Sequence, residues 1–322
     1  MSSHVTMGPG REFDAVRALL EQWGAAAVGI GDDGAVLDVP AGSRLVVSTD
    51  TTVEDVHFRR AWLTPTEIGW RAATAALSDL AAMGSSPLGV LVALTVPARW
   101  RDALGALAEG IGAAAEAAGA PIVGGDVTDG DRLALSITVL GHAPRPLTRA
   151  GARPGDTLYV TGRLGGPAAA LAAWERGAAP RAGDRARFAH PEARIVAGEW
   201  FAVHGATAAI DLSDGLAGDA AHLAAASGTR CVIALERIPA LAPNTAQDAL
   251  VSGEEYELLV AAPEIDADAF AAALDGLVLT AIGRVEASDR AETSGRRIGE
   301  VVGELDGKRV PLPGAHDHFV KR

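Results

Sequence analysis

The sequence has 322 residues but only one cysteine, Cys231. A single cysteine excludes an internal disulfide framework, and it excludes zinc or iron–sulfur sites built from several cysteines. Because Cys231 precedes Val232 and Ile233, we expect a buried thiol in a strand. Long apolar runs are also missing: the most apolar stretches, such as 88–96, have about nine residues, whereas a membrane-spanning helix needs roughly 20. The first ten residues lack the charged and apolar regions of a secretion signal, so we expect a cytoplasmic protein with no membrane partner.

Positive charge is scarce. The chain has 28 Lys and Arg residues against 41 Asp and Glu residues, which gives a formal net charge of −13. Because it has no run of basic residues with which to hold a polyphosphate backbone, we expect no nucleic-acid partner. The phosphate-binding P-loop pattern and the paired H-R-D and D-F-G motifs of protein kinases are absent as well. If the protein binds ATP, it must do so through Mg²⁺ and acidic residues.

The sequence does contain an alternation of strand and helix patterns, which is typical of an α/β fold. Apolar residues make up 48% of the chain, enough for the cores of two ordinary domains. Periodicity predicts helices over 11–23, 65–83, 102–118, 191–203 and 216–226, and strands over 25–30, 35–39, 44–49, 89–96, 121–123, 133–140, 157–161 and 231–235. The segment 141–156, rich in Pro, Gly and Arg, indicates a linker, so we expect domains at 1–145 and 146–322. We expect the polar stretch 173–189 to be an irregular connection.

Carboxylates directly follow several of the predicted strands. Converging carboxylates repel one another and raise one another's pKa unless cations lie between them. Hard oxygen ligands of this kind suit Mg²⁺ or Mn²⁺ rather than zinc or copper. Asp79 joins the set because an Asp on the apolar side of a helix is costly unless it is paired or metal-bound. Any one Asp could be a helix cap, but the set favours a magnesium–nucleotide site made of Asp32, Asp33, Asp50, Asp79, Asp126, Asp211 and Asp214.

The segment Gly29–Gly34 also matches G-x-G-x-x-G, the dinucleotide-binding pattern. That motif works by bringing bare backbone N–H groups to a pyrophosphate at the start of a helix. Asp32 and Asp33 would place negative charge where the phosphate must lie, and the residues that follow read as a strand. We therefore exclude a dinucleotide fold.

Six motifs then occur in an order that resembles the thiamine-monophosphate kinase family, within the superfamily of aminoimidazole ribonucleotide synthetase-like ATP-binding enzymes. The motifs are Gly-Ile-Gly-Asp-Asp-Gly-Ala at 29–35, Ser-Thr-Asp-Thr at 48–51 with His57-Phe58, Leu-Ser-Asp-Leu-Ala-Ala-Met-Gly at 77–84, Gly-Gly-Asp at 124–126, Leu-Thr-Arg-Ala-Gly at 147–151 and Ile-Asp-Leu-Ser-Asp-Gly at 210–215. The resemblance covers nearly the whole chain.

This resemblance implies a two-domain fold of the α/β (α+β) class. Its N-terminal domain has a mixed sheet with helices and dimerises through that sheet, and its C-terminal domain is α/β. The resemblance also implies a homodimeric kinase that uses ATP and several Mg²⁺ ions to convert thiamine monophosphate to thiamine diphosphate. Transfer would be direct and in line, with no protein nucleophile.

The resemblance carries site residues over position by position. It implies magnesium ligands at Asp32 or Asp33, Ser48, Thr49, Asp50, Asp79, Asp126, Asp211 and Asp214. It implies ATP contacts from Gly124, Gly125, Arg149 and Ser213, and a substrate contact from His57. Arg149 suits this role because a guanidinium binds phosphate oxygens through paired donors.

Two departures from the family pattern concern the substrate. Where the family has Gly-Gly-Glu-Asp-Tyr-Glu-Leu, this chain has Ser252-Gly-Glu-Glu-Tyr-Glu-Leu258, so the substrate contacts implied at Glu254 and Glu255 include one longer side chain. The family's closing motif has a large aromatic residue that stacks on thiamine, and His316 stands in its place.

Two other interpretations stay open. The same fold could use ATP to activate an amide, carbamoyl or selenide group. The selenide branch is disfavoured because the chain has no reactive cysteine near its N-terminus, and the carbamoyl branch because no terminal cysteine follows Phe319. A non-catalytic protein that binds a nucleotide or a thiamine phosphate is the second alternative. It would be expected to lose magnesium ligands, yet every expected Asp position is filled.

Overall fold

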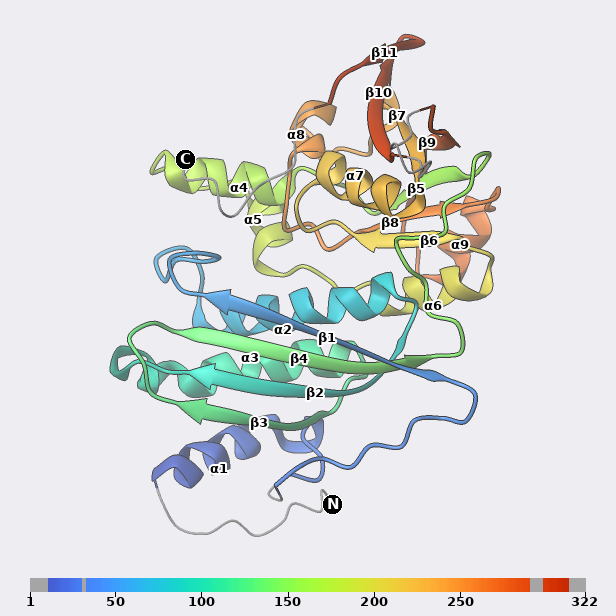
Figure 1. Cartoon of the computed structure of the whole chain (residues 1–322). Coiled ribbons are helices and arrows are strands. Elements are labelled where there is room, and N and C mark those ends of the chain that lie inside the picture. The colour runs from blue at the N-terminus through green and yellow to red at the C-terminus, as the bar shows by residue number, and fades with distance from the viewer. Residues whose placement is uncertain (1–10, 31–32, 290–297, 313–322) are drawn as a thin grey trace. The chain divides into compact units, whose positions relative to one another are not determined.

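The computed structural model describes residues 11–30, 33–289 and 298–312, and its chain forms two compact units (Figure 1). The first unit consists of Met1–Leu80 and Ser85–Arg145, and the second of Ala81–Gly84 and Pro146–Arg322. Among the described residues, no helix combines the length and the apolar character needed to cross a membrane.

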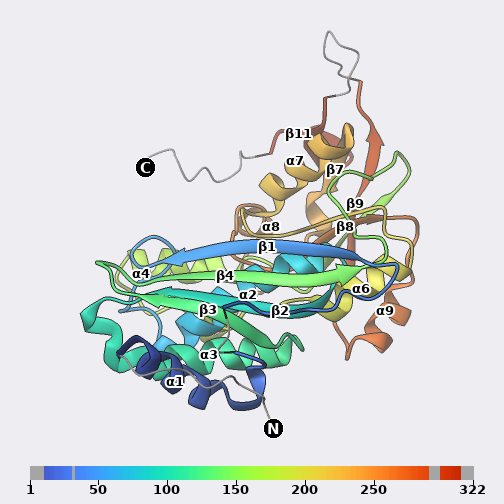
Figure 2. The ribbon, with the colours of Figure 1, turned by 60° about the horizontal axis from the view of Figure 1, so that its bottom comes forward.

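The first unit is built on a four-stranded mixed sheet. Its strands are β1 (Arg44–Val53), β2 (Ser86–Thr95), β3 (Ile122–Thr128) and β4 (Ala134–Ala143), in the order β1-β4-β2-β3. Only β2 and β3 are parallel to each other. The helices α2 (Pro65–Ala82) and α3 (Leu104–Ala117) cover one face of this sheet (Figures 1 and 2). The helix α1 (Arg11–Trp23) packs against α3 and β3, and two 3-10 turns, η1 (Gly24–Ala26) and η2 (Ala98–Ala103), complete the unit.

Buried and less buried side chains alternate along the strands, and this alternation distinguishes the helix-covered face of the sheet from its other face. In β2, Val90, Val92 and Leu94 are buried against the helices, whereas Leu91 and Ala93 point to the other face. Residues of one strand alternate between the two faces of a sheet. The unit therefore has a helix-covered face and an open face.

Glycines let α2 and α3 approach closely. A Cβ atom at Gly69 would lie 2.1 Å from the Leu107 carbonyl oxygen, and one at Gly110 would lie 1.9 Å from the Thr66 carbonyl oxygen. Larger residues at either position would force the helices apart. The two glycines thus fix the layer that backs the sheet.

Two predicted strands of this unit are wrong. The segment 25–30 begins to pair with β3 through the Val28 N–H, which donates to the Ile122 carbonyl at 2.8 Å. Gly29 then takes a φ of 66°, which turns the chain away. The segment 35–39 has no strand structure and is mostly exposed. Apolar periodicity alone does not supply the hydrogen-bonded neighbour that a strand needs.

Two other strands are longer than predicted. β1 pairs with β4 as far as Val53, so Asp50 lies inside the strand instead of after it. β3 extends to Thr128, so Asp126 also lies within its strand. Pairing with neighbours that are distant in sequence carries both strands past the carboxylates.

The second unit has a seven-stranded mixed sheet in the order β11-β10-β7-β9-β5-β8-β6. Its strands are β5 (Thr157–Thr161), β6 (Ala208–Asp211), β7 (Thr229–Ala234), β8 (Leu258–Ala262), β9 (Leu279–Ala287), β10 (Glu300–Leu305) and β11 (Lys308–Val310). Its helices are α4 (Gly166–Glu175), α5 (Ala182–Ala189), α6 (Ile195–Val203), α7 (Leu216–Ser227), α8 (Ala246–Leu250) and α9 (Ala267–Ala273), with a 3-10 turn η3 (Leu235–Arg237). The core lies where α7 packs against β6, β7 and β10.

Two expectations for this unit have opposite outcomes. Cys231 is fully buried in β7, as predicted, and burial raises the pKa of its thiol to about 12. The segment 173–189 is not an irregular connection throughout, because α5 forms within it. Phe188 and Ala189 of α5 are buried, so packing stabilises a helix whose sequence is too polar to indicate one.

Candidate functional site

A cavity of about 570 Å³ lies on the open face of the first unit. Gly124, Gly125 and Asp126 of β3 line it together with Asp33 and Thr138. A Cβ atom at Gly125 would lie 1.9 Å from the Val92 carbonyl oxygen, so only glycine fits there. The cavity therefore combines bare backbone with carboxylates, a surface that a magnesium–phosphate group could approach.

A second group of predicted ligands lies on the opposite, helix-covered face. The Ser48 hydroxyl of β1 donates a hydrogen bond to the Asp79 carboxylate of α2. Asp50 pairs in register with the buried Ile137, which places it on the same face as Ser48. Thr49 points to the open face instead, where its hydroxyl lies 2.9 Å from that of Thr138.

The sheet keeps these two groups apart. Asp126 pairs with Ala93, whose partner Ser136 lines the cavity, so Asp126 belongs to the open face. β1 and β3 are separated by β4 and β2, which puts Asp50 and Asp126 about 14 Å apart at roughly 4.8 Å per strand spacing. A Mg²⁺ ion lies about 2 Å from each oxygen ligand, so one ion cannot join both residues of a single chain. No group of three Asp, Glu, His or Cys side chains within 11–30, 33–289 and 298–312 is arranged to hold a metal ion.

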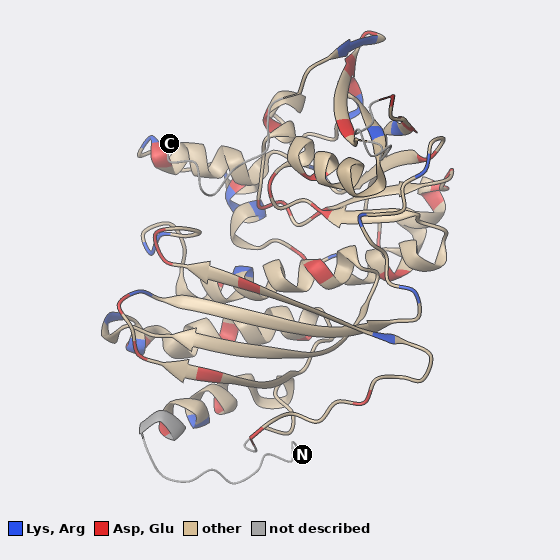
Figure 3. Cartoon of the chain, viewed as in Figure 1, with Lys and Arg blue, Asp and Glu red and all other residues tan. Residues whose placement is uncertain are grey.

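The acidic residues appear in Figure 3 in α2, β1 and β3 of the first unit, and again around the second sheet. Asp32 lies outside the described residues, as does His316. Asp33 is the member of the Asp32–Asp33 pair that the structure places, and it lines the cavity.

His57 lies in the segment after β1 with a defined ring orientation. The ring Nδ1 of His57 accepts a hydrogen bond from the Val53 N–H at 3.1 Å, and the backbone N–H of His57 donates to the Val53 carbonyl at 3.0 Å. An accepting Nδ1 assigns the ring proton of the neutral imidazole to Nε2. The hydrogen bond from Val53 thereby fixes the orientation of the ring.

The same segment is anchored by Glu54, a buried carboxylate beside β1. Burial alone raises the pKa of Glu54, but three donors outweigh it and hold the pKa below its usual value. These donors are the Leu133 N–H, the Trp100 indole and the Arg99 guanidinium. The anchor fixes where the chain leaves β1 toward His57.

In the second unit, Asp211, Ser213 and Asp214 lie between β6 and α7. Asp211 is the last residue of β6, as the sequence predicts. Asp219 of α7, which the sequence reasoning missed, accepts hydrogen bonds from the Ser213 and Asp214 N–H groups, both at 3.1 Å. Its side chain is buried, and burial together with the charges of Asp211 and Asp214 raises its pKa to about 8. The signal that could have revealed it is the one used for Asp79, an Asp among apolar residues in a helix.

Arg149 lies in an exposed segment near the start of the Pro146–Arg322 part of the second unit. The Ser227 hydroxyl donates to the Arg149 carbonyl at 2.8 Å and accepts from the Gly151 and Ala152 N–H groups at 3.1 Å. One hydroxyl thus fixes the backbone that carries Arg149.

Glu254 and Glu255 differ sharply in their surroundings. The Tyr256 hydroxyl donates to the Glu254 carboxylate at 3.0 Å. The side chain of Glu255 is buried, and one carboxylate oxygen accepts from the Gly165 N–H. Its other oxygen has no hydrogen-bond partner. Burial raises the pKa of Glu255 to about 7. The Arg187 guanidinium, 3.6 Å from that oxygen, opposes the rise but does not outweigh burial.

Comparison with known proteins agrees with this architecture. Residues 31–143 match the family "AIR synthase related protein, N-terminal domain" and residues 153–295 match "AIR synthase related protein, C-terminal domain". The thiamine-monophosphate kinase of Escherichia coli (strain K12) is 36% identical over 294 residues, which cover 86% of this chain and 89% of that one. The predicted two-domain α/β fold class is thereby confirmed.

Solved structures of this family have the same fold along nearly the whole chain. The thiamine-monophosphate kinase of Stenotrophomonas maltophilia K279a has a TM-score of 0.77 and 33% identity, covering 91% of this chain and 97% of that one. AaThiL complexed with AMPPCP and TMP has a TM-score of 0.73 and 28% identity, covering 98% and 99%. The chain therefore belongs to the thiamine-monophosphate kinase family of AIR synthase related proteins.

Proposed function

We propose that this protein is a kinase that uses ATP to phosphorylate thiamine monophosphate to thiamine diphosphate, a step of thiamine diphosphate biosynthesis. The observation that carries the proposal is the match along 98% of the chain to a relative that was solved with AMPPCP and TMP bound. The family's acidic positions within the described residues are all filled, which supports a catalyst over a protein that only binds.

The residues present fit magnesium ions. The donor set consists of carboxylates and hydroxyls, which are the oxygen ligands that Mg²⁺ prefers. Burial, together with the charges of Asp211 and Asp214, raises the pKa of Asp219, and a cation would relieve the repulsion among these three carboxylates. On the open face Asp33, Thr49 and Asp126 would hold ions, on the helix-covered face Ser48, Asp50 and Asp79, and in the second unit Asp211 and Asp214. When bound, magnesium neutralises the phosphate oxygens between which charge moves.

The chain's own residues would bind and orient the reactants. Gly124 and Gly125 line the cavity without side chains of their own, which suits backbone contact with a phosphate. Arg149 can hold phosphate oxygens through paired donors. His57 would contact the substrate. The acceptor phosphate is already an anion, so direct in-line transfer requires no general base and no protein nucleophile.

A homodimer joined by the open faces belongs to the same proposal. Leu45 and Val47 of β1 are 51% and 55% exposed on that face, although both are large apolar residues. Exposed apolar area on one sheet face is typical of an interface. A second chain on the open face would give the ligands of that face, Asp33, Thr49 and Asp126, another set of neighbours.

The experiment that tests the function compares acceptors. ADP release from Mg-ATP is measured with thiamine monophosphate, thiamine and carbamoyl phosphate, and we expect turnover with thiamine monophosphate alone. Asp126→Asn should abolish it, whereas Asp131→Asn, at an exposed residue between β3 and β4, should not. Turnover with a different acceptor only, or equal loss in both variants, would contradict the proposal.

A further inference from the structure

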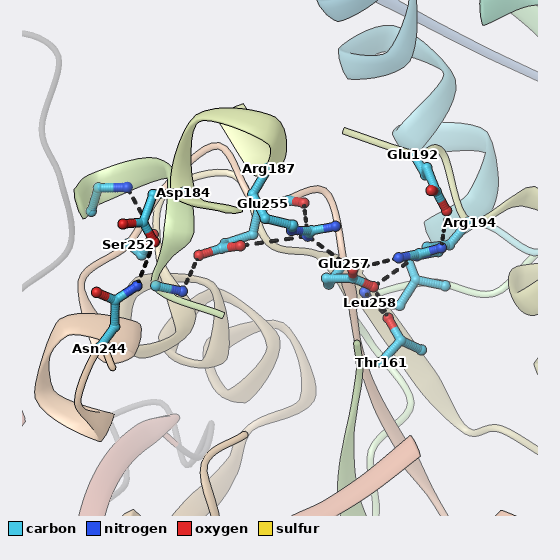
Figure 4. A network of polar contacts seen from close by, with 12 residues as sticks. Thr161, Asp184, Arg187, Glu192, Arg194, Asn244, Ser252, Glu255, Glu257 and Leu258 are labelled. Carbon is cyan, nitrogen blue, oxygen red and sulfur yellow. Dashed lines mark hydrogen bonds and ion pairs between the residues drawn. The ribbon is translucent and has the colours of Figure 1, made fainter. Parts of the chain in front are cut away.

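The buried Glu257 carboxylate accepts hydrogen bonds from three side chains. Glu257 is 1% exposed. Arg194 donates to both of its oxygens, at 2.8 and 2.7 Å, Arg187 donates at 2.9 Å and the Thr161 hydroxyl at 2.7 Å (Figure 4). Burial opposes ionisation of Glu257, but the hydrogen bonds and charge of Arg194, with Arg187, hold its pKa below the usual value. Glu257 is therefore a fixed anion in the interior.

The backbone of residues 254–257, which ends at Glu257, forms hydrogen bonds with Leu212 and Ser213, next to the proposed ligand Asp214. The Glu254 N–H donates to the Ser213 carbonyl at 2.8 Å, and the Leu212 N–H donates to the Glu257 carbonyl at 2.8 Å. The Glu255 and Tyr256 N–H groups both donate to the Leu212 carbonyl, at 3.1 and 2.9 Å. The chain from 212 to 213 thus has its carbonyls fixed by 254–256, while Asp219 fixes the N–H groups that follow.

To form these hydrogen bonds, residues 254–256 adopt backbone conformations that are rare for residues other than glycine. Glu254 and Tyr256 both have left-handed conformations, with φ of 62° and 55°. For residues other than glycine such conformations cost of order 1 kcal/mol or more each and persist only where the surroundings enforce them. Glu257 lies directly after this stretch and forms ion pairs with Arg187 of α5 and with Arg194 before α6.

A further pair of contacts ties the segment to α4. The Ser252 hydroxyl accepts from the Ala168 N–H at 3.2 Å, and the Glu255 carboxylate accepts from the Gly165 N–H. Helix N-termini leave N–H groups that need partners, and Gly165, which precedes α4, supplies no side-chain cap of its own. Ser252 and Glu255, the residues of 252–258 that depart from the family pattern, thus cap a neighbouring helix.

Buried ion pairs contribute little net stability, because apolar residues of similar volume often serve as well. A carboxylate with two guanidinium partners is thus better explained by geometry than by stability. We infer that Glu257, held by Arg187 and Arg194, is a positioning residue that sets where Ser213 and Asp214 present themselves to magnesium and nucleotide. The inference rests on the proposed function, because it takes these two residues as ligands.

The test measures ligand affinity in the full-length protein. Titration calorimetry with Mg²⁺ and AMPPCP compares wild type with Glu257→Gln, which keeps the volume but removes the charge. Loss of a group that orients metal ligands typically lowers affinity by about 10- to 100-fold, so we expect the Kd to rise at least about tenfold. The matched control is Glu300→Gln, which removes a partner of Arg230 in the same unit, and it should leave the Kd within about twofold of wild type.

A positioning role also predicts a local signature. In Glu257→Gln, amide exchange at Leu212 should accelerate while exchange in β7 and β9 stays as in wild type. If Glu257→Gln does not fold, Arg194→Lys keeps the positive charge but loses the paired donation and should weaken binding in the same direction. An unchanged Kd in a folded Glu257→Gln, or in Arg194→Lys when the first variant fails, would overturn the inference.

Turnover of thiamine monophosphate is measured separately, so that the two proposals can fail independently. Weaker Mg-AMPPCP binding in Glu257→Gln would support the inference even if wild type does not phosphorylate thiamine monophosphate. If wild type does not bind Mg-AMPPCP at all, the inference fails together with the proposed function.

Discussion

Replacing the buried Glu255 by glutamine should change how the stability of the second unit depends on pH. Burial raises the pKa of Glu255 from 4.5 to about 7. The folded state therefore holds the proton more tightly than the unfolded state. Its contribution to stability is fully present below pH 4.5, where both states are protonated, and it is lost as the pH rises toward 7, where only the unfolded state ionises freely.

The size of the effect follows from the shift. The difference 7 − 4.5 is 2.5 units, and at 1.36 kcal/mol per unit it corresponds to about 3 kcal/mol of unfolding free energy lost between pH 4.5 and pH 7. The side chain is 1% exposed, so solvent screening does not reduce this figure substantially. Glutamine cannot ionise and is free of this loss.

The assay is urea unfolding of wild type and Glu255→Gln at several pH values from 5 to 8, without ligands. Glu236→Gln, at an exposed glutamate of the same unit, accounts for the general effect of removing one carboxylate. The wild-type stability relative to Glu255→Gln should fall by about 2.5 kcal/mol between pH 5 and pH 8, because part of the change lies below pH 5. A flat or rising difference would refute the reasoning, as would a ¹³C NMR titration that places the Glu255 carboxyl midpoint near 4.5.

Three further changes follow from single contacts. Asp219→Ala leaves two backbone N–H groups without an acceptor and should lower the unfolding free energy by roughly 2–4 kcal/mol, while Asp219→Asn keeps an acceptor and should cost less than half of that in the same denaturant titration. Gly125→Ala places a methyl group against a neighbouring strand carbonyl and should abolish activity and lower the melting temperature, whereas Gly105→Ala, with nothing within 4 Å, should stabilise α3 by about 0.5–1 kcal/mol. Equal melting temperatures in these two glycine variants would contradict the close approach. Ser48→Ala removes the hydroxyl that orients Asp79 and should raise the Mg²⁺ concentration for half-maximal rate about tenfold. An unchanged Mg²⁺ requirement would contradict a role of Ser48 in metal binding.

Local signals in the sequence predicted elements whose ends are set by residues close by along the chain. The helix 11–23 and the strand 157–161 have the predicted bounds. Asp211 ends its strand as predicted, because the turn toward Gly215 and α7 follows within a few residues. Patterns of this kind depend on neighbours along the chain and can be read from sequence.

Pairing between distant segments could not be read in the same way. Asp50 and Asp126 lie inside longer strands because β4 and β2 extend the ladders past them. Their placement on opposite faces depends on register, and one residue of slip would exchange the faces. The Glu257–Arg187 contact joins residues 70 positions apart, and the local sequence around Glu257 carries no sign of it.

The most direct test of the central claim is ³¹P NMR of the protein with Mg-ATP and thiamine monophosphate. The account predicts that the monophosphate signal is replaced by the two coupled signals of thiamine diphosphate, with ADP formed in equal amount. ATP that stays intact, or ATP that yields ADP and orthophosphate while thiamine monophosphate is unchanged, would contradict it.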